Sequence, residues 1–288
     1  MISESLRKRI SALNRRDLKG PFSNVSEVPE SEPESESSAY GPSVSTLRHQ
    51  ELPDGVESSN PEGSFYRIEH SFQQLLHQKG GPFLRRYERI LSSPTDQDNL
   101  SGIEGCKVED FLFVDVEATG LTAGTPLFLV GALFHSSADL KIVQMFARDY
   151  TEEAALLHHF TDVLANKEVV ISFNGKSYDL PYIRDRCIFH GVPFKLGCTH
   201  IDMLHEARRR WRTRLPNCKL QTLEKHICHR RRTGDIPGAE IPDAYHRYVH
   251  TGNVSQIHDI LHHNALDLIT LAELLVVVLE QGSRESSE

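Results

Sequence analysis

From residue 107 onward, hydrophobic and polar positions follow the pattern of an α/β domain. The run at 111–117 is short and dominated by apolar side chains, as expected of a buried strand. Similar apolar runs predict four further strands, at 127–134, 140–146, 169–173 and 200–202. Apolar residues at helical spacing predict helices at 152–164, 179–190, 203–213, 219–228, 242–250 and 256–280. The expected fold is a five-stranded mixed α/β sheet, flanked by helices and followed by a helical C-terminal part.

The N-terminal third has a different composition. Residues 1–20 are basic and fit a short amphipathic helix, whereas 21–62 are rich in Ser, Pro and Glu. Such a segment cannot bury enough apolar surface to offset the entropy lost on ordering. The sequence therefore predicts four segments: a disordered acidic tail (1–62), an N-terminal extension and linker (63–106), the α/β domain (107–281) and a disordered C-terminus (282–288).

The formal net charge of −8 at first argues against a nucleic-acid partner. However, residues 21–62 contain nine acidic residues and one basic residue, which account for the whole excess. The rest of the chain is neutral overall, so nucleic acid remains compatible with it. The acidic segment fits either a solvated linker or a tail that binds a protein partner.

Several features predict a cytoplasmic protein that makes no contact with membranes. The N-terminal residues run into a basic stretch with no apolar segment behind it, unlike a secretory signal. The longest uninterrupted apolar run, 274–279, is six residues, too short to span a bilayer. The five cysteines form no C-x-x-C pair.

Two acidic residues interrupt the first predicted strand. Asp115 and Glu117 lie two positions apart and therefore share one face. Unpaired buried charges cost several kcal/mol, on the order of 3–5, and no Arg or Lys stands nearby in the sequence to neutralise them. A divalent cation would do so. The alternative, acids exposed on an edge strand, fits poorly with the neighbouring Phe113, Val114 and Val116.

Three more acids lie within predicted elements or at their ends. Asp179 opens a helix after a glycine turn that ends a strand, where α/β sheets commonly hold active-site carboxylates. Alternatively, it is only a helix N-cap. Asp267 interrupts an apolar stripe on the last helix, or is simply a surface acid of that helix. Asp202, after the fifth strand, fits either a residue that supports the site or another N-cap.

Taken in order, these motifs resemble the three exonuclease motifs of the DEDD (DnaQ-like) superfamily. The first corresponds to 114–121, the second to 173–179, and the third to His263, Asn264 and Asp267. More narrowly, the segments 200–204, 215–220, 235–238 and 263–267 are similar to the bacterial YprB-like ribonuclease-H-like domain. The resemblance covers about 107–281.

This resemblance implies a 3′→5′ exonuclease that hydrolyses single-stranded DNA or RNA with two Mg²⁺ or Mn²⁺ ions. It assigns the metal ligands as Asp115, Glu117, Asp179 and Asp267. His263 is the implied base that orients the attacking water. His262 stands one position earlier and is the alternative if the helix begins only after Asn264.

The resemblance also implies substrate contacts, which are Thr119, Gly120, Leu121, Asn174, Lys176 and Tyr178. Two basic runs, 208–214 and 229–232, suit a phosphate backbone, and Trp211 in the first suits a stacking platform. Both runs are equally compatible with a solvated helix face.

Two other functions remain open. A structure-specific endonuclease of the ribonuclease H type usually carries a single Asp on the first strand, which favours the exonuclease here. A catalytically silent nucleic-acid-binding module is expected to have lost one of the four acids, and all four are present.

Overall fold

The computed structural model of the protein describes residues 51–93, 100–232 and 234–285. The basic segment 1–20 and residues 21–50 of the acidic segment lie outside the described residues. The predictions made for them, including a protein partner for the acidic tail, remain predictions.

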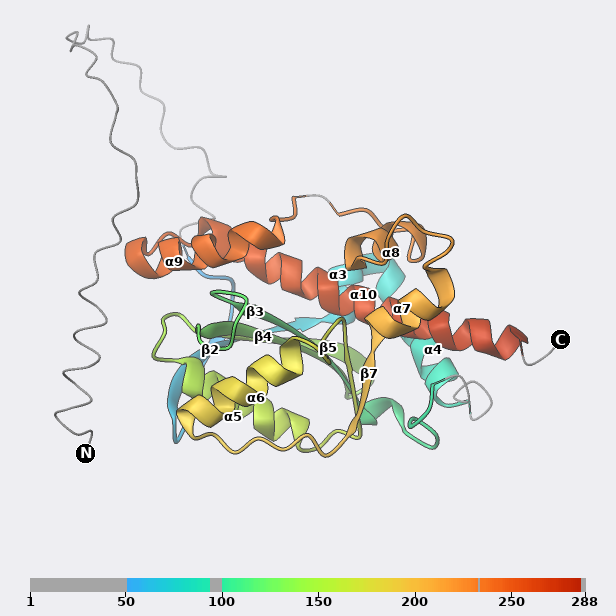
Figure 1. Ribbon diagram of the computed structural model, residues 1–288, viewed down its shortest axis with the longest axis horizontal. Coiled ribbons are helices and arrows are strands. Elements are labelled where there is room, and N and C mark those ends of the chain that lie inside the picture. The colour runs from blue at the N-terminus through green and yellow to red at the C-terminus, as the bar shows by residue number, and fades with distance from the viewer. Residues whose placement is uncertain (1–50, 94–99, 233, 286–288) are drawn as a thin grey trace, which may run out of the picture. The chain divides into compact units, whose positions relative to one another are not determined.

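One mixed sheet is the centre of the fold (Figure 1). Its strand order is β1-β2-β5-β4-β3-β6-β7, and β3, β6 and β7 run parallel to one another while all other neighbours are antiparallel. The strands are β1 (Val56–Asn60), β2 (Gly63–Ser71), β3 (Phe111–Ala118), β4 (Leu127–Ser136), β5 (Asp139–Phe146), β6 (Val169–Ser172) and β7 (Thr199–Asp202). The expected mixed α/β sheet is confirmed, and the expected five strands are present as β3 to β7.

The number of strands and the N-terminal boundaries differ from the prediction. β1 lies inside the segment predicted to be disordered, and β2 lies in the predicted extension. β2 pairs with β5 and buries Phe65 and Ile68, so this part of the chain completes the sheet. β1 escaped prediction because it is held by backbone pairing with β2 and by contacts such as Asn60 Nδ2 to the Ala155 carbonyl (2.8 Å), not by an apolar face.

Helices cover both faces of the sheet. They are α3 (Phe72–Leu76), α4 (Gly80–Leu91), α5 (Glu153–Leu164), α6 (Asp179–His190), α7 (Met203–Trp211), α8 (Leu220–His226), α9 (Ile241–Thr251) and α10 (Ser255–Glu285), with short 3-10 helices η1 (His77–Lys79), η3 (Val108–Asp110) and η4 (Gly238–Glu240). The C-terminus predicted to be disordered from residue 282 is helical through Glu285, since no proline stops α10.

The two faces of β3 point to different helical layers. Leu112 and Val114 pack into the core beside α5 and α6, while Phe111 and Phe113 pack into the core that contains α4, α7 and α10. In Figure 1, α10 crosses the sheet on the side opposite to α5 and α6. Because side chains alternate along a strand, the odd-numbered acids of β3 face the α10 layer.

α10 is the central helix of this layer. Between Ser255 and Gln281 it is long and apolar enough to cross a membrane, with a mean hydropathy of 1.5 in its most apolar window. However, 72% of that window is buried inside the protein. A long helix that packs on a sheet has the same apolar composition, and the burial identifies α10 as a core helix.

Candidate active site

Three elements that are distant in sequence bring acidic side chains to one edge of the sheet. β3 and β6 are parallel, so their carboxyl ends lie at the same edge. β3 carries Asp115 and Glu117 there, and the turn after β6 leads to Asp179, the first residue of α6. α10 crosses this edge and contributes Asp267. The structure thus brings together the four acids singled out from the sequence.

The pKa values of these acids show that they form one electrostatic group. Burial raises the pKa of Asp115 and Glu117 well above the usual range, and the charge of Asp267 raises both further. Burial, followed by the charges of Asp202 and Asp267, raises the pKa of Asp179 to about 8. Burial also raises the pKa of Asp267, against the opposing effect of Arg232. Ionising all four carboxylates without a compensating cation is therefore costly.

Asn264 fixes one carboxylate of this group. Its Nδ2 donates to Asp115 Oδ2 (2.7 Å), and its Oδ1 accepts from Gln144 Nε2 (2.9 Å). Gly131 of β4 stands between Asp115 and Gln144 in strand register, and a Cβ there would lie 2.2 Å from Asn264 Oδ1. The glycine therefore leaves the space that the amide occupies. Gln144 was not foreseen from the sequence, although a lone glutamine within an apolar strand was a usable signal.

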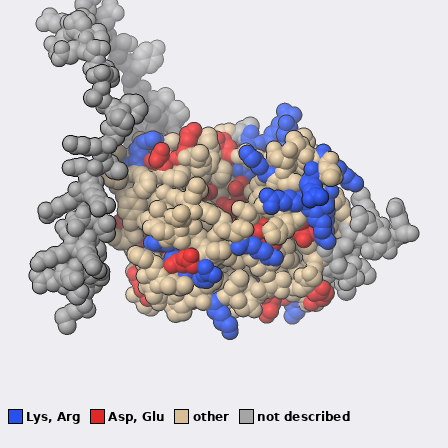
Figure 2. Space-filling view, in the orientation of Figure 1, with Lys and Arg blue, Asp and Glu red and all other residues tan. Residues whose placement is uncertain are grey.

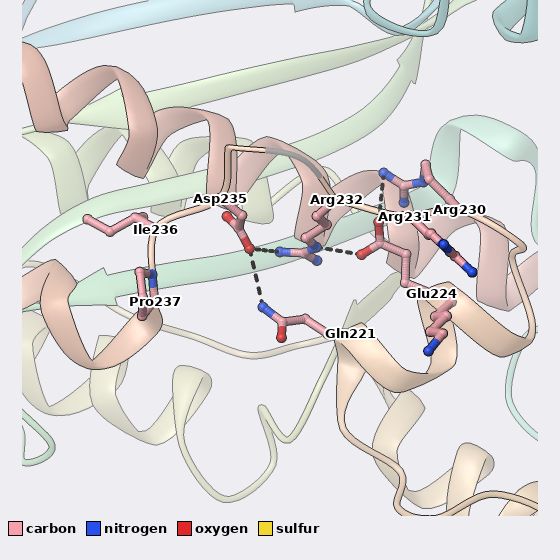
Figure 3. A pocket seen from close by; sticks show the side chains of 9 residues that line it. Gln221, Glu224, Arg230, Arg231, Arg232, Asp235, Ile236 and Pro237 are labelled. Carbon is pink, nitrogen blue, oxygen red and sulfur yellow. Dashed lines mark hydrogen bonds and ion pairs between the residues drawn. The ribbon is translucent and has the colours of Figure 1, made fainter.

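Asp267 has a cationic partner that the sequence did not reveal. The Arg232 guanidinium donates to Asp267 and also to Glu224 and Asp235, and its side chain is only 8% exposed. Figure 3 shows Arg232 between Glu224 and Asp235, at a cavity of about 590 Å³. The expectation that no Arg or Lys lies nearby was made for Asp115 and Glu117 and does not extend to Asp267, which Arg232 approaches from a loop 35 residues away.

No comparable partner reaches Glu117 or Asp179. Within the described part of the chain, neither carboxylate accepts a hydrogen bond or forms an ion pair with a cation. Asp179 is buried at the first turn of α6, and the structure gives α6 no side-chain cap, so Asp179 is not the simple N-cap considered from the sequence. These two side chains are therefore free to bind a cation.

The two adjacent histidines lie on different sides of α10. The helix begins at Ser255 and is regular at both positions, so His263 is one turn before Asp267 while His262 is exposed. His263 Nε2 lies 3.5 Å from Asp267 Oδ2, and its Nδ1 lies 2.7 Å from Asp235 Oδ1. The contact with Asp235 was not foreseen, although Asp235 belongs to one of the segments that carry the family resemblance.

Asp202 supports the turn that leads to Asp179. Its carboxylate accepts from the backbone N–H groups of Asn174 (2.8 Å), Lys176 (3.1 Å) and Leu204 (3.0 Å). The last bond caps α7. Asp202 therefore fits both interpretations of the sequence, because it caps α7 and also holds the turn of the second motif in place.

The predicted substrate residues surround the acids in two groups. Thr119 is buried, with its hydroxyl donating to the Pro126 carbonyl (3.0 Å), while Leu121 is 87% exposed. Asn174 and Lys176 are exposed in the turn after β6. Tyr178 joins the groups because its hydroxyl donates to the Gly120 carbonyl (3.1 Å).

The basic runs are only partly available to a ligand. Trp211 is 3% exposed in the core, so the structure rules it out as a stacking platform. Arg230 and Arg232 are engaged in ion pairs with Glu224 and other acids, contrary to a phosphate-binding or fully solvated run. Figure 2 nevertheless shows Lys and Arg side chains gathered over α7 and α8, next to a hollow that contains acidic side chains.

The donor set suits a hard divalent cation, although the carboxylates do not form a finished ligand cage. Four carboxylates offer the oxygen ligands that Mg²⁺ and Mn²⁺ prefer. Among the described residues, no group of three or more His, Cys, Asp and Glu side chains stands ready to hold a metal ion. The ion pair between Arg232 and Asp267 directs one of the four carboxylates to a guanidinium.

The fold and the acidic site define a nuclease-like α/β protein. Residues 112–279, more than half of the chain, match the family model of the RNase_H superfamily, and the chain belongs to this family. The chain is similar to the uncharacterized protein YprB of Bacillus subtilis, at 29% identity over 219 residues. This match covers 74% of the chain and 52% of YprB, so the chain spans about half the length of that relative.

A solved structure is also similar. The family B DNA polymerase from the hyperthermophilic archaeon Pyrobaculum calidifontis aligns at 14% identity with a TM-score of 0.46. The alignment covers 60% of this chain and 26% of the polymerase chain.

Proposed function

We propose that this protein is a metal-dependent 3′→5′ exonuclease that hydrolyses phosphodiester bonds in single-stranded nucleic acid. The convergence of Asp115, Glu117, Asp179 and Asp267 carries the proposal, because burial raises the pKa of all four and the charge of Asp267 raises the pKa of the other three further. Buried like charges destabilise a fold unless a cation compensates them. The direction of degradation rests on the resemblance of the three motifs to those of DEDD exonucleases.

The four carboxylates would hold two Mg²⁺ or Mn²⁺ ions. Bound there, the ions would lower the pKa of a water molecule and stabilise charge on the attacking and leaving oxygens. Glu117 and Asp179 have carboxylates without competing partners, whereas Asn264 orients Asp115 through a hydrogen bond. Asp267 becomes available once Arg232 releases it.

His263 is suited to take a proton from the attacking water. Asp235 accepts from Nδ1–H, which leaves the lone pair of the neutral ring on Nε2, on the side of Asp267. A histidine held this way can act as a general base. Asp235 then serves as a positioning residue that keeps the ring in the productive orientation.

The substrate would enter between two segments. The loop at 119–121, with exposed Leu121 at its tip, would hold the terminal nucleotide, and Asn174, Lys176 and Tyr178 would contact phosphate or sugar. The hydrogen bond from Tyr178 to Gly120 keeps the segments at a fixed separation. This rigidity supports correct placement of the scissile phosphate.

A nuclease assay with end-labelled substrates tests the proposal. Single-stranded and duplex DNA and RNA, labelled at the 3′ or the 5′ end, are incubated with Mg²⁺, Mn²⁺ or EDTA. We expect a 5′-labelled single strand to shorten stepwise in the presence of metal only. Asp115→Asn should be inactive, while Asp185→Asn, an exposed acid on α6, is the matched control and should stay active.

The assay also separates the alternatives. Cleavage of circular strands would identify an endonuclease of the ribonuclease H type. The silent binding module is favoured by one observation, the ion pair between Arg232 and Asp267, since a guanidinium there meets part of the demand for a cation. Binding of nucleic acid without hydrolysis under any metal condition would support that module and refute the exonuclease.

A further inference from the structure

A second cavity, of about 400 Å³, adjoins the turn after β6. Its volume falls within the range of small-ligand pockets, about 300–1,000 Å³. Its lining combines an apolar surface with polar and basic side chains. The apolar residues are Phe173, Leu204 and Leu220, and the polar and basic residues are Arg208, Asn217 and Lys219. Leu204 and Leu220 are buried, and Phe173 is partly buried against the core of the α10 layer. A flat apolar group fits this surface.

The basic side chains at this cavity have no competing anion. Among the described residues, neither Arg208 nor Lys219 forms an ion pair, and both are exposed. The next two arginines of α7 differ, because Arg209 and Arg210 both pair with Glu206. The positive charges of Arg208 and Lys219 are therefore available to an anionic ligand.

The cavity shares a wall with the candidate active site. Asn174 lines the cavity, and a Cβ on the next residue, Gly175, would lie 2.9 Å from Asp179 Oδ2. Asp202 binds the backbone of Asn174 and of Leu204, so the wall and the apolar surface are fixed to the same buried carboxylate. The cavity therefore borders the turn that leads to Asp179.

We propose that this cavity, formed by Phe173, Arg208 and Lys219, is a subsite for one unpaired nucleotide of the substrate. The base stacks on the Phe173 ring, and Arg208 and Lys219 bind the adjoining phosphates. Aromatic stacking and unpaired basic side chains are the chemistry that binds single strands without regard to sequence. The subsite rests on the proposed nuclease function and assigns residues that would hold an unpaired base of the single strand.

Equilibrium binding tests the subsite separately from hydrolysis. All variants carry Asp115→Asn to prevent cleavage, and fluorescence anisotropy is followed with fluorescein-labelled single-stranded RNA, single-stranded DNA and a matching duplex. Phe173→Leu, which keeps an apolar side chain, should weaken single-strand binding about 5- to 150-fold. Arg208→Ala and Lys219→Ala should each reduce the slope of log K against log salt by about 0.7. The two single-strand arms show which sugar the subsite accepts.

Lys195→Ala is the matched control. Lys195 is exposed in the loop before β7, at the end of that strand opposite to Asp202, and should affect neither affinity nor slope. Because Arg208 and Lys219 are exposed, their variants should fold even if Phe173→Leu loses stability. Affinities and slopes of Arg208→Ala and Lys219→Ala equal to those of Lys195→Ala would overturn the subsite, as would a preference for the duplex.

Hydrolysis assays separate the subsite from the nuclease proposal. If the protein without Asp115→Asn hydrolyses no substrate while the binding differences persist, the subsite stands and the exonuclease does not. If that protein degrades single strands while the cavity variants bind like the control, the exonuclease stands and the subsite is refuted.

Discussion

The Arg232 guanidinium donates to the Asp267 carboxylate, so a buried cation occupies a side chain that the family motif assigns to metal. If the proposed function is correct, Arg232 and the metal ions compete for Asp267. Replacing Arg232 by Met removes the competitor and should tighten binding of Mn²⁺ by about tenfold or more, since a hydrogen bond to a charged group contributes about 1.5–3 kcal/mol. Isothermal titration calorimetry of the free protein measures this change without any substrate.

Arg231→Met is the control for this experiment, because Arg231 lines the same cavity and is exposed. It should leave Mn²⁺ affinity unchanged. Weaker binding of Mn²⁺ by Arg232→Met would show instead that Arg232 holds Asp267 in the orientation that the metal needs.

The raised pKa of Asp179 predicts a pH-dependent stability of the metal-free protein. Burial raises this pKa to about 8 in the folded state, compared with about 3.9 in an unfolded chain. Between these values the folded state binds the proton more tightly, so the free energy of unfolding decreases as pH rises, by at most about 1.4 kcal/mol per pH unit. In EDTA, the melting temperature should fall from about pH 4 to about pH 8.

Asp179→Asn should flatten this profile, because the amide does not titrate, whereas Asp185→Asn should keep the original slope. Differential scanning fluorimetry across the pH range gives both. An unchanged slope in Asp179→Asn would show that another group dominates the pH dependence.

The positions of the two histidines predict unequal effects on catalysis. In single-turnover hydrolysis, His263→Ala should lose about 10²-fold or more of the rate, as expected for loss of a general base. His262→Ala should retain nearly the original rate, since this ring is exposed on another side of α10. A large loss in His262→Ala, or in neither variant, would remove His263 from the mechanism.

Gly131 predicts a packing constraint beside the site. A Cβ at this position would lie 2.2 Å from Asn264 Oδ1 and would displace the amide that holds Asp115. Gly131→Ala should therefore lower the free energy of unfolding by about 1–3 kcal/mol, the usual cost of overpacking. Gly197→Ala is the control, because a Cβ there meets only Lys195 at 3.8 Å. Urea denaturation compares the two, and equal stability would contradict the constraint.

The N-terminal boundary gives a fifth prediction. Removal of residues 1–62 deletes β1, together with its pairing to β2 and the ion pair between Glu57 and Arg148 (2.7 Å). This truncation should lower the melting temperature by several degrees, about 2–4 °C for each kcal/mol lost in a domain of this size. Removal of residues 1–50 keeps every described contact and is the matched control. Identical melting temperatures would restore the boundary at residue 62 that the composition predicted.

Local patterns in the sequence were sufficient for most of the fold. Strands β3 to β7 and helices α5 to α10 follow from the pattern of apolar residues. The spacing of apolar residues within one element indicates whether it is a strand or a helix and which face it buries. The four acids were also visible, because each interrupts an apolar pattern or opens an element. Periodicity did not reveal β1, whose pairing is made by backbone groups that every residue carries.

Only the tertiary structure decided which charges meet. Arg232 reaches Asp267, Asp235 reaches His263, and Trp211 is buried in the core although it sits within a basic run. None of these contacts is fixed by spacing along the chain, because the partners belong to different elements and meet only after the sheet and α10 have packed. The sequence therefore indicated which acids would gather, and tertiary packing decided that Arg232 and Asp235 would contact Asp267 and His263 of α10.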